Sequence, residues 1–171
     1  MSGRSELDRV TDSAWLSFPV ASRLGRFVGG DVMKLQAYLN FGGDCEEAFR
    51  FYERHLGGKI LGLMRFNEQP EPSNVPPGTE NYVLHADMAI GETRLMGNDV
   101  PKERFQPIRS SYLSLTVDSS EEAERIGDLL SEGGEVFMPM AETFFAFRFG
   151  IMRDRFGVLW MILHQKPMPN S

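Results

Sequence analysis

The sequence predicts an α+β fold of two tandem βαβββ modules, whose curved mixed sheets surround a cleft and carry their helices on the outer face. Three observations predict this fold: an internal repeat, an alternating strand before a capped amphipathic helix in each copy, and three strand candidates after each helix. The stretches 37–41, Asp44, 46–48 and 56–60 match 111–115, Asp118, 121–123 and 132–136 in the same order.

Each copy opens with a strand in which apolar and polar residues alternate. In the first copy, Leu39 and Phe41 fall on one face, and Tyr38 and Asn40 fall on the other. The opening strand of the second copy, 112–117, alternates in the same way. One face of each strand is therefore expected to be buried, and the other to line the cleft.

A helix is expected after each opening strand. Asp44 and Glu47 have the spacing of a capping box with Asp in place of Ser or Thr, and Ser119 and Glu122 fit the box fully. Apolar residues then recur at helical spacing, and a double glycine follows in both copies, as a left-handed helix end requires.

The remaining strands and connections complete the two modules. The segment 67–81 contains four prolines and is long for a compact domain, so we expect a lid-like loop there. A single domain over 33–166 is expected, with halves of about 33–99 and 110–166 joined by a linker of about 100–109. The six further strands are expected at about 59–66, 82–90, 93–98, 135–140, 144–152 and 158–164.

The two ends of the chain fall outside this pattern. Residues 1–32 show no sustained periodicity, and 167–171 form a short tail. Codons for Gly29-Gly30 can contain a purine-rich ribosome-binding sequence shortly before Met33. Two interpretations of 1–32 stay open: a poorly ordered arm of the native protein, or translated sequence upstream of a true start at Met33.

Composition excludes several classes of function. The net charge of −6 and pI near 5.1 favour neither nucleic acid nor an anionic membrane as a partner. The single cysteine, Cys45, excludes an intrachain disulfide, and its place in the apolar stripe of the first helix predicts packing rather than reactivity. No secretory signal or membrane-spanning run is apparent, so we expect a cytoplasmic protein.

Several sequence motifs resemble those of one protein family. The pattern Tyr38-Leu39-x-Phe41-x-Gly43-x-Cys45-x-Glu47-Ala48-x-x-Phe51-Tyr52, with His85-Ala86 and Asp154-Arg155-Phe156-Gly157-Val158-x-Trp160, resembles the PhnB-like branch of the vicinal-oxygen-chelate (glyoxalase, bleomycin resistance and extradiol dioxygenase) superfamily. The resemblance covers roughly 33–166. It implies the duplicated fold already expected from the repeat. No glycine-rich nucleotide loop follows a strand, which argues against a methyltransferase.

The same resemblance implies where a metal would bind. Metal-dependent members carry a His on the opening strand and a Glu on the last strand of each half. The repeat places these positions at Tyr38 (Ala37 by ungapped alignment), Leu95, Tyr112 and Met161. Aliphatic and thioether chains do not hold a hard divalent ion, and neutral phenols hold one poorly. We therefore expect neither metal nor cofactor.

Two residues of the third strand are candidates for proton transfer. His85 and Asp87 are expected on one face, and a His beside a carboxylate can act as a general base near neutral pH. The alternatives are a buried, hydrogen-bonded structural His, or a pair at the rim of the cleft.

A second group is expected to bind ligand. Polar contacts to the ligand would come from Tyr38, Asn40, Tyr112 and Ser114. Apolar contacts would come from Leu95, Phe147 and Met161. Arg148, among phenylalanines, would either pair with an anionic group or extend to solvent from an edge.

These residues predict a protein that binds a small amphipathic organic molecule in its cleft. The alternative function is a metal-independent isomerase or lyase that uses His85, Asp87 or a cleft tyrosine. We also expect a symmetric homodimer, as in many members of the superfamily.

Overall fold

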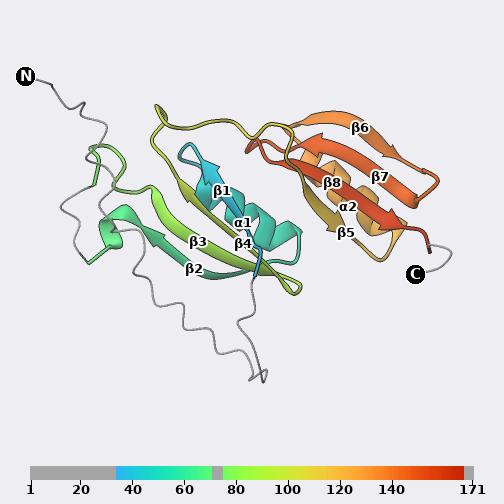
Figure 1. The fold of residues 1–171 in the computed structure, drawn as a ribbon, viewed down its shortest axis with the longest axis horizontal. Helices are drawn as coiled ribbons and strands as arrows, with labels where there is room; N and C mark the ends of the chain where they lie inside the picture. The colour runs from blue at the N-terminus through green and yellow to red at the C-terminus, as the bar shows by residue number, and fades with distance from the viewer. Residues whose placement is uncertain (1–33, 71–74, 168–171) are drawn as a thin grey trace, which may run out of the picture. The chain divides into compact units, whose positions relative to one another are not determined.

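The computed structural model describes residues 34–70 and 75–167, which form two four-stranded mixed sheets with one helix against each (Figure 1). The first module contains β1 (Ala37–Phe41), α1 (Cys45–His55), β2 (Lys59–Arg65), a 3-10 helix (Phe66–Glu68), β3 (Val83–Ile90) and β4 (Thr93–Asp99). The second contains β5 (Leu113–Thr116), α2 (Ser120–Ser131), β6 (Glu135–Ala141), β7 (Ala146–Arg153) and β8 (Leu159–Gln165). The predicted α+β class and the βαβββ repeat are confirmed.

The two sheets have the same topology. The strand order is β1-β4-β3-β2 in the first sheet and β5-β8-β7-β6 in the second. The opening strand pairs in parallel with the last strand of its module, and the other pairs are antiparallel. A helical crossover is what brings two parallel strands together, whereas short turns join antiparallel ones.

Some predicted segments reach beyond what the structure describes. Residues 1–32 and most of the tail lie outside the described residues, as do 71–74 of the expected lid loop. Residues 100–109, predicted to be a linker, contain a turn and otherwise lie outside helices and strands. Neither helix in the described part of the chain has the length and apolar character needed to cross a bilayer.

The two helices begin by different means. Ser119 caps α2 as predicted, because its side chain accepts a hydrogen bond from the Glu122 backbone N–H at 3.1 Å. Asp44, in contrast, makes no side-chain cap for α1. Its place is taken by Asp99 at the end of β4, whose Oδ1 accepts from the backbone N–H groups of Gly43 and Cys45 at 2.9 and 3.0 Å.

The ends of both helices match the prediction. Gly57 and Gly133 adopt φ angles of +67° and +72°, which a residue with a Cβ adopts only at a cost. The first glycine of each pair therefore turns the chain out of its helix and into the following strand.

The hydrophobic core lies on the helix side of both sheets. One continuous cluster contains Phe49 and Tyr52 of α1, Ile126 of α2, and Trp160 of β8. The predicted packing of Cys45 is confirmed, since its exposure is 0%. Trp160 is also buried, with an exposure of 2%. Burial and neighbouring carboxylates raise the pKa of the Cys45 thiol, so it stays protonated.

A buried carboxylate joins the two modules within this core. Asp154, in the turn between β7 and β8, accepts hydrogen bonds from the backbone N–H groups of Phe156 and Val158 and from the Trp160 indole. It also accepts from the Tyr52 hydroxyl of α1 at 2.6 Å. These four donors fix the turn and fasten it to the helix of the other module.

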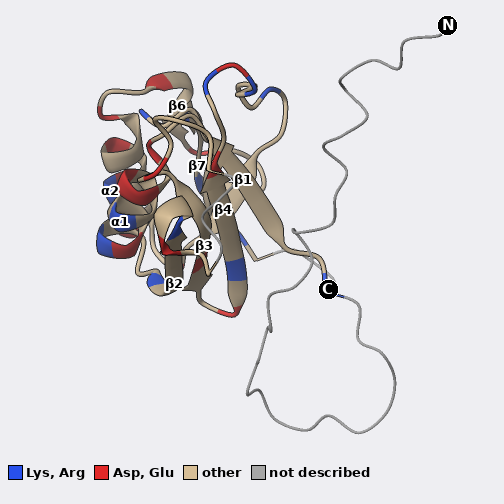
Figure 2. Cartoon of the chain, turned by 90° about the vertical axis from the view of Figure 1, so that its left-hand side faces the viewer, with Lys and Arg blue, Asp and Glu red and all other residues tan. Residues whose placement is uncertain are grey.

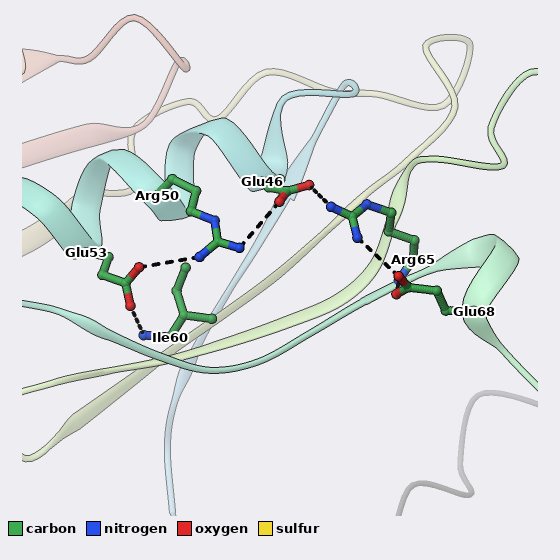
Figure 3. Close-up of polar contacts among 6 residues, drawn as sticks. All are labelled: Glu46, Arg50, Glu53, Ile60, Arg65 and Glu68. Carbon is green, nitrogen blue, oxygen red and sulfur yellow. Dashed lines mark hydrogen bonds and ion pairs between the residues drawn. The ribbon is translucent and has the colours of Figure 1, made fainter.

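Charged residues are concentrated on the helices and loops, and most of the length of the strands in view is uncharged (Figure 2). Figure 3 shows one group, in which Arg65 of β2 lies between Glu46 of α1 and Glu68, while Arg50 bridges Glu46 and Glu53. Such exposed pairs contribute little free energy individually, and one of them, between Arg65 and Glu46, joins β2 to α1.

Candidate functional site

The open face of each sheet, the face opposite its helix, carries the candidate site. In β1 and β4, Leu39 pairs with Gly97, and a Cβ on Gly97 would meet the Phe49 and Phe41 rings of the core. Because side chains alternate along a strand, the neighbouring positions point to the open face. The open face of the first sheet therefore carries Tyr38, Asn40, His85, Asp87, Arg94, Met96 and Asn98.

Tyr38 and His85 meet above the middle of this face. The Tyr38 Oη and His85 Nδ1 atoms are 3.3 Å apart, and the two rings are stacked with centroids 5.9 Å apart. Since β4 lies between β1 and β3, this contact spans β4. Burial raises the pKa of Tyr38, with Cys45 adding to the effect, so the phenol is neutral at physiological pH.

Asp87 shares the face with His85, as predicted. Both of its oxygens accept hydrogen bonds from Arg94, through Nε at 2.7 Å and through Nη2. This two-point contact fixes the two side chains relative to each other. Asp87 thus serves first to hold Arg94 against the sheet.

Asn98 is a residue that the sequence prediction missed. It is 7% exposed, and its Oδ1 is a buried oxygen with no hydrogen-bond partner among the described residues. A buried carbonyl without a donor costs free energy, so such groups are uncommon in folded proteins. Asn98 pairs with Asn40 in the β1–β4 ladder, beside Tyr38 and Met96.

The strand pairing corrects the prediction that Leu95 occupies the superfamily's metal-ligand position on the last strand of the first half. Leu95 is 4% exposed and belongs to the core under α1, so it does not reach the open face. In the repeat, Asn40 matches Ser114, and these residues pair with Asn98 and Met161 respectively. Asn98 is therefore the counterpart of Met161. Counting from the turn glycine fails because the turn before β4 is shorter than the turn before β8.

The open face of the second sheet is less polar. Ser114 is exposed opposite a partly buried Met161, and Tyr112, two residues before Ser114, is 41% exposed. Three of the predicted ligand-binding residues thus lie together on this face. The rings of Phe145 and Phe149 pack against each other nearby on β7 and its approach, at 5.2 Å between centroids.

Arg148 and Phe147, which were also predicted to bind ligand, do not belong to the group formed by Tyr112, Ser114 and Met161. Arg148 donates through Nε to Glu124 of α2 at 2.6 Å, which places its side chain on the helix side of the sheet. A register irregularity between Ala146 and Arg148 changes the alternation at this point, which the sequence pattern does not reveal. Phe147 is 38% exposed and packs on His164, with ring centroids 4.9 Å apart.

Comparison with known proteins assigns the class of this domain. The family model described as the Glyoxalase/Bleomycin resistance protein/Dioxygenase superfamily matches residues 34–162. The chain belongs to this superfamily.

Particular relatives narrow the resemblance. Protein YjdN of Escherichia coli (strain K12) is 35% identical over 147 residues, covering 81% of this chain and 100% of YjdN. The crystal structure of protein PA1353 from Pseudomonas aeruginosa superposes with a TM-score of 0.72 and 38% identity, over 80% of this chain and 100% of that one. A structure from Bacillus cereus is described as a putative 3-demethylubiquinone-9 3-methyltransferase, PhnB protein. It superposes with a TM-score of 0.67 and 26% identity, over 77% of this chain and 99% of that one. The predicted resemblance to the PhnB-like branch is confirmed.

Proposed function

We propose that this protein binds a small amphipathic organic molecule on the open faces of its sheets, without a resident metal ion. The observation that carries the proposal is the buried Asn98 Oδ1, which has no partner among the described residues. A ligand N–H or O–H group would supply the missing donor. The Tyr38 hydroxyl and His85 ring, above the same strand, offer further polar contacts.

Exposed apolar side chains in both modules support an amphipathic ligand. Tyr38, Leu61, Tyr112 and Phe137 are each 41–48% exposed, although aromatic and branched residues of this size are usually buried. Exposed apolar side chains can contact the apolar part of a bound molecule. An organic molecule with an apolar body and a few polar atoms matches both groups of side chains.

The residues at the superfamily's metal positions do not fit a divalent ion. With the corrected register these positions hold Tyr38, Asn98, Tyr112 and Met161, which supply neutral phenols, an amide and a thioether. Hard divalent ions prefer carboxylate ligands, and borderline ions prefer imidazole and thiolate. The raised pKa of Tyr38 further disfavours a phenolate ligand. We therefore derive no chemical step through a metal.

Replacement of the unpartnered amide tests this binding site. The substitution Asn98→Leu removes the unsatisfied carbonyl at similar volume, so the ligand-free protein should become more stable by about 1 kcal/mol in urea denaturation. The control Asn67→Leu changes an exposed asparagine and should alter stability by less than about 0.5 kcal/mol.

The same variant tests ligand binding. A panel of small aromatic and heteroaromatic alcohols, amines and acids, screened by thermal shift, should contain compounds that raise the Tm of the wild type and of Asn67→Leu but not that of Asn98→Leu. Compounds that stabilise all three proteins equally would place the binding site elsewhere. A panel without any stabilising compound would also count against the proposal.

A symmetric homodimer is part of the proposal. Among the described residues, the contacts that join the two cores lie on the helix side of the sheets. A second copy would shield the exposed side chains of the open faces from water. We expect sedimentation velocity at micromolar concentration to give about twice the mass of the 19.4 kDa chain. A single species of monomer mass would contradict this expectation.

Proton transfer is a second candidate function, and the contact between Tyr38 and His85 favours it. A His that shares a hydrogen bond with a phenol can accept a proton from a bound carbon acid and return it at a neighbouring carbon. This proton shift describes a metal-independent isomerase, and a lyase would follow the same proton removal with loss of a leaving group from the neighbouring carbon. Asp87 would act only through its contact with Arg94. If this proton transfer occurs, His85→Ala should abolish turnover of a compound found in the screen while changing its Kd less than threefold. Equal turnover by wild type and His85→Ala would exclude this role.

A further inference from the structure

A hollow of about 750 Å³ lies away from the centre of the open faces. The linker, the end of β1 and the turn between β7 and β8 surround it. Four basic residues line it: Lys102, Arg109, Arg153 and Arg155. Asp44 is the carboxylate among the described lining residues. Two of these cations are already paired, Arg153 with Glu135 at 2.9 Å and Arg155 with Glu47 at 3.5 Å, so Lys102 and Arg109 supply the positive charge beside the hollow that is unpaired among the described residues.

Arg155 is held in a fixed orientation. Its guanidinium carbon lies 4.7 Å from the ring centroid of Phe51 and 4.8 Å from that of Phe156. Asp154 fixes the turn on which Arg155 and Phe156 lie. Glu47, 3.5 Å from Arg155, is 69% exposed and thus a weak competitor for it. A preorganised guanidinium loses little entropy when it binds an anion.

Lys102 and Arg109 add cations from the opposite side. Both are exposed, and neither forms an ion pair with any residue of 34–70 or 75–167. Backbone hydrogen bonds from Arg104 and Phe105 to Pro101 hold the linker in a turn at this point. Phe105 and Ile108 line the hollow between the two cations with apolar surface.

We propose that this hollow is a second binding site, which takes a small organic anion with a phosphate or carboxylate beside an apolar group. Guanidinium groups recognise both oxyanions through paired N–H donors, and the phenylalanine and isoleucine surfaces accept the apolar part. The site shares Asn40 with the open face, and its basic residues lie outside the group around Tyr38 and His85. It does not depend on the function proposed above.

Calorimetric titration with phenyl phosphate tests the site on the full chain. Inorganic phosphate, benzoate and phenol serve as the comparison ligands. If the site prefers phosphate, phenyl phosphate should bind more tightly than inorganic phosphate and phenol. If it prefers carboxylate, benzoate should bind more tightly than both. Added salt should weaken the binding. The double substitution Lys102→Gln and Arg109→Gln should raise the Kd about tenfold, because each exposed charge contributes roughly half of one decade.

Matched controls separate this site from a general charge effect. Arg54 and Lys59 are exposed basic residues outside the hollow, so Arg54→Gln with Lys59→Gln should leave the Kd unchanged. Circular dichroism checks that both double variants are folded. Equal affinity of wild type and the Lys102/Arg109 variant would overturn the proposal, as would failure of both anions to bind at millimolar concentration. NMR shifts induced by phenyl phosphate around Tyr38 and His85 alone would likewise assign the anion to the open face.

Discussion

Replacing Asp154 by alanine should lower the free energy of unfolding by about 3–5 kcal/mol, because it leaves four buried donors without their acceptor. Two of these donors, the Tyr52 hydroxyl and the Trp160 indole, belong to the shared core. Loss of the hydrogen bonds that Asp154 accepts from these two groups removes the link between α1 and the turn of the other module, and it also destabilises the turn. Chemical denaturation followed by tryptophan fluorescence measures the change.

Two comparison variants distinguish this explanation from a general cost of mutation. Tyr52→Phe removes one donor and keeps the ring, so it should cost only about 1 kcal/mol. Asp118→Ala replaces an exposed aspartate and should change stability by less than about 0.5 kcal/mol. A loss at Asp154 no greater than that of Tyr52→Phe would show that the other three hydrogen bonds contribute little.

Asp99→Ala should have an effect of comparable size in the first module. The Asp99 carboxylate, 2% exposed, accepts from the backbone N–H groups of Gly43, Cys45 and Val83 at 2.8–3.0 Å. Alanine would leave all three donors unsatisfied and remove the cap of α1, at a cost of about 3–5 kcal/mol. Thermal and urea denaturation should both show the loss.

The position of these hydrogen bonds predicts the pattern of the damage. Asp99→Asn keeps one acceptor oxygen and should cost less than Asp99→Ala, whereas Asp128→Ala on the exposed side of α2 should cost almost nothing. Hydrogen exchange should accelerate at the start of α1 and at Val83 before it changes in the second module. Uniform acceleration across both modules would contradict a local role for Asp99.

Local pattern was sufficient to predict most of the fold. Alternation and helical spacing act over a few residues, so they located both α-helices and all eight strands of the described part to within about two residues. The 3-10 helix Phe66–Glu68 was not predicted, because a single short turn leaves no periodic pattern in the sequence. The cap of α1 was missed because its acceptor, Asp99, lies 54 residues from Cys45 in the sequence.

The candidate site was predicted in part, for the same reason. Alternation placed Tyr38, Asn40, His85 and Asp87 on one face, but the partner of Asp87 depends on the pairing of β3 with β4. Asn98 was missed because counting from a turn glycine ignores the difference between the two turns. Matching Asn40 to Ser114 across the repeat, and then following the strand pairs, would have identified it.

Elemental analysis together with native mass spectrometry, on protein purified without chelator, tests the central claim of metal-independent binding most directly. We predict far less than one transition-metal ion per chain, and a compound from the screen that remains bound in the spectrum of the wild type and is lost from that of Asn98→Leu. Treatment with EDTA should leave that bound mass unchanged. One zinc, nickel, manganese or iron ion per chain, with ligand lost on chelation, would contradict the account.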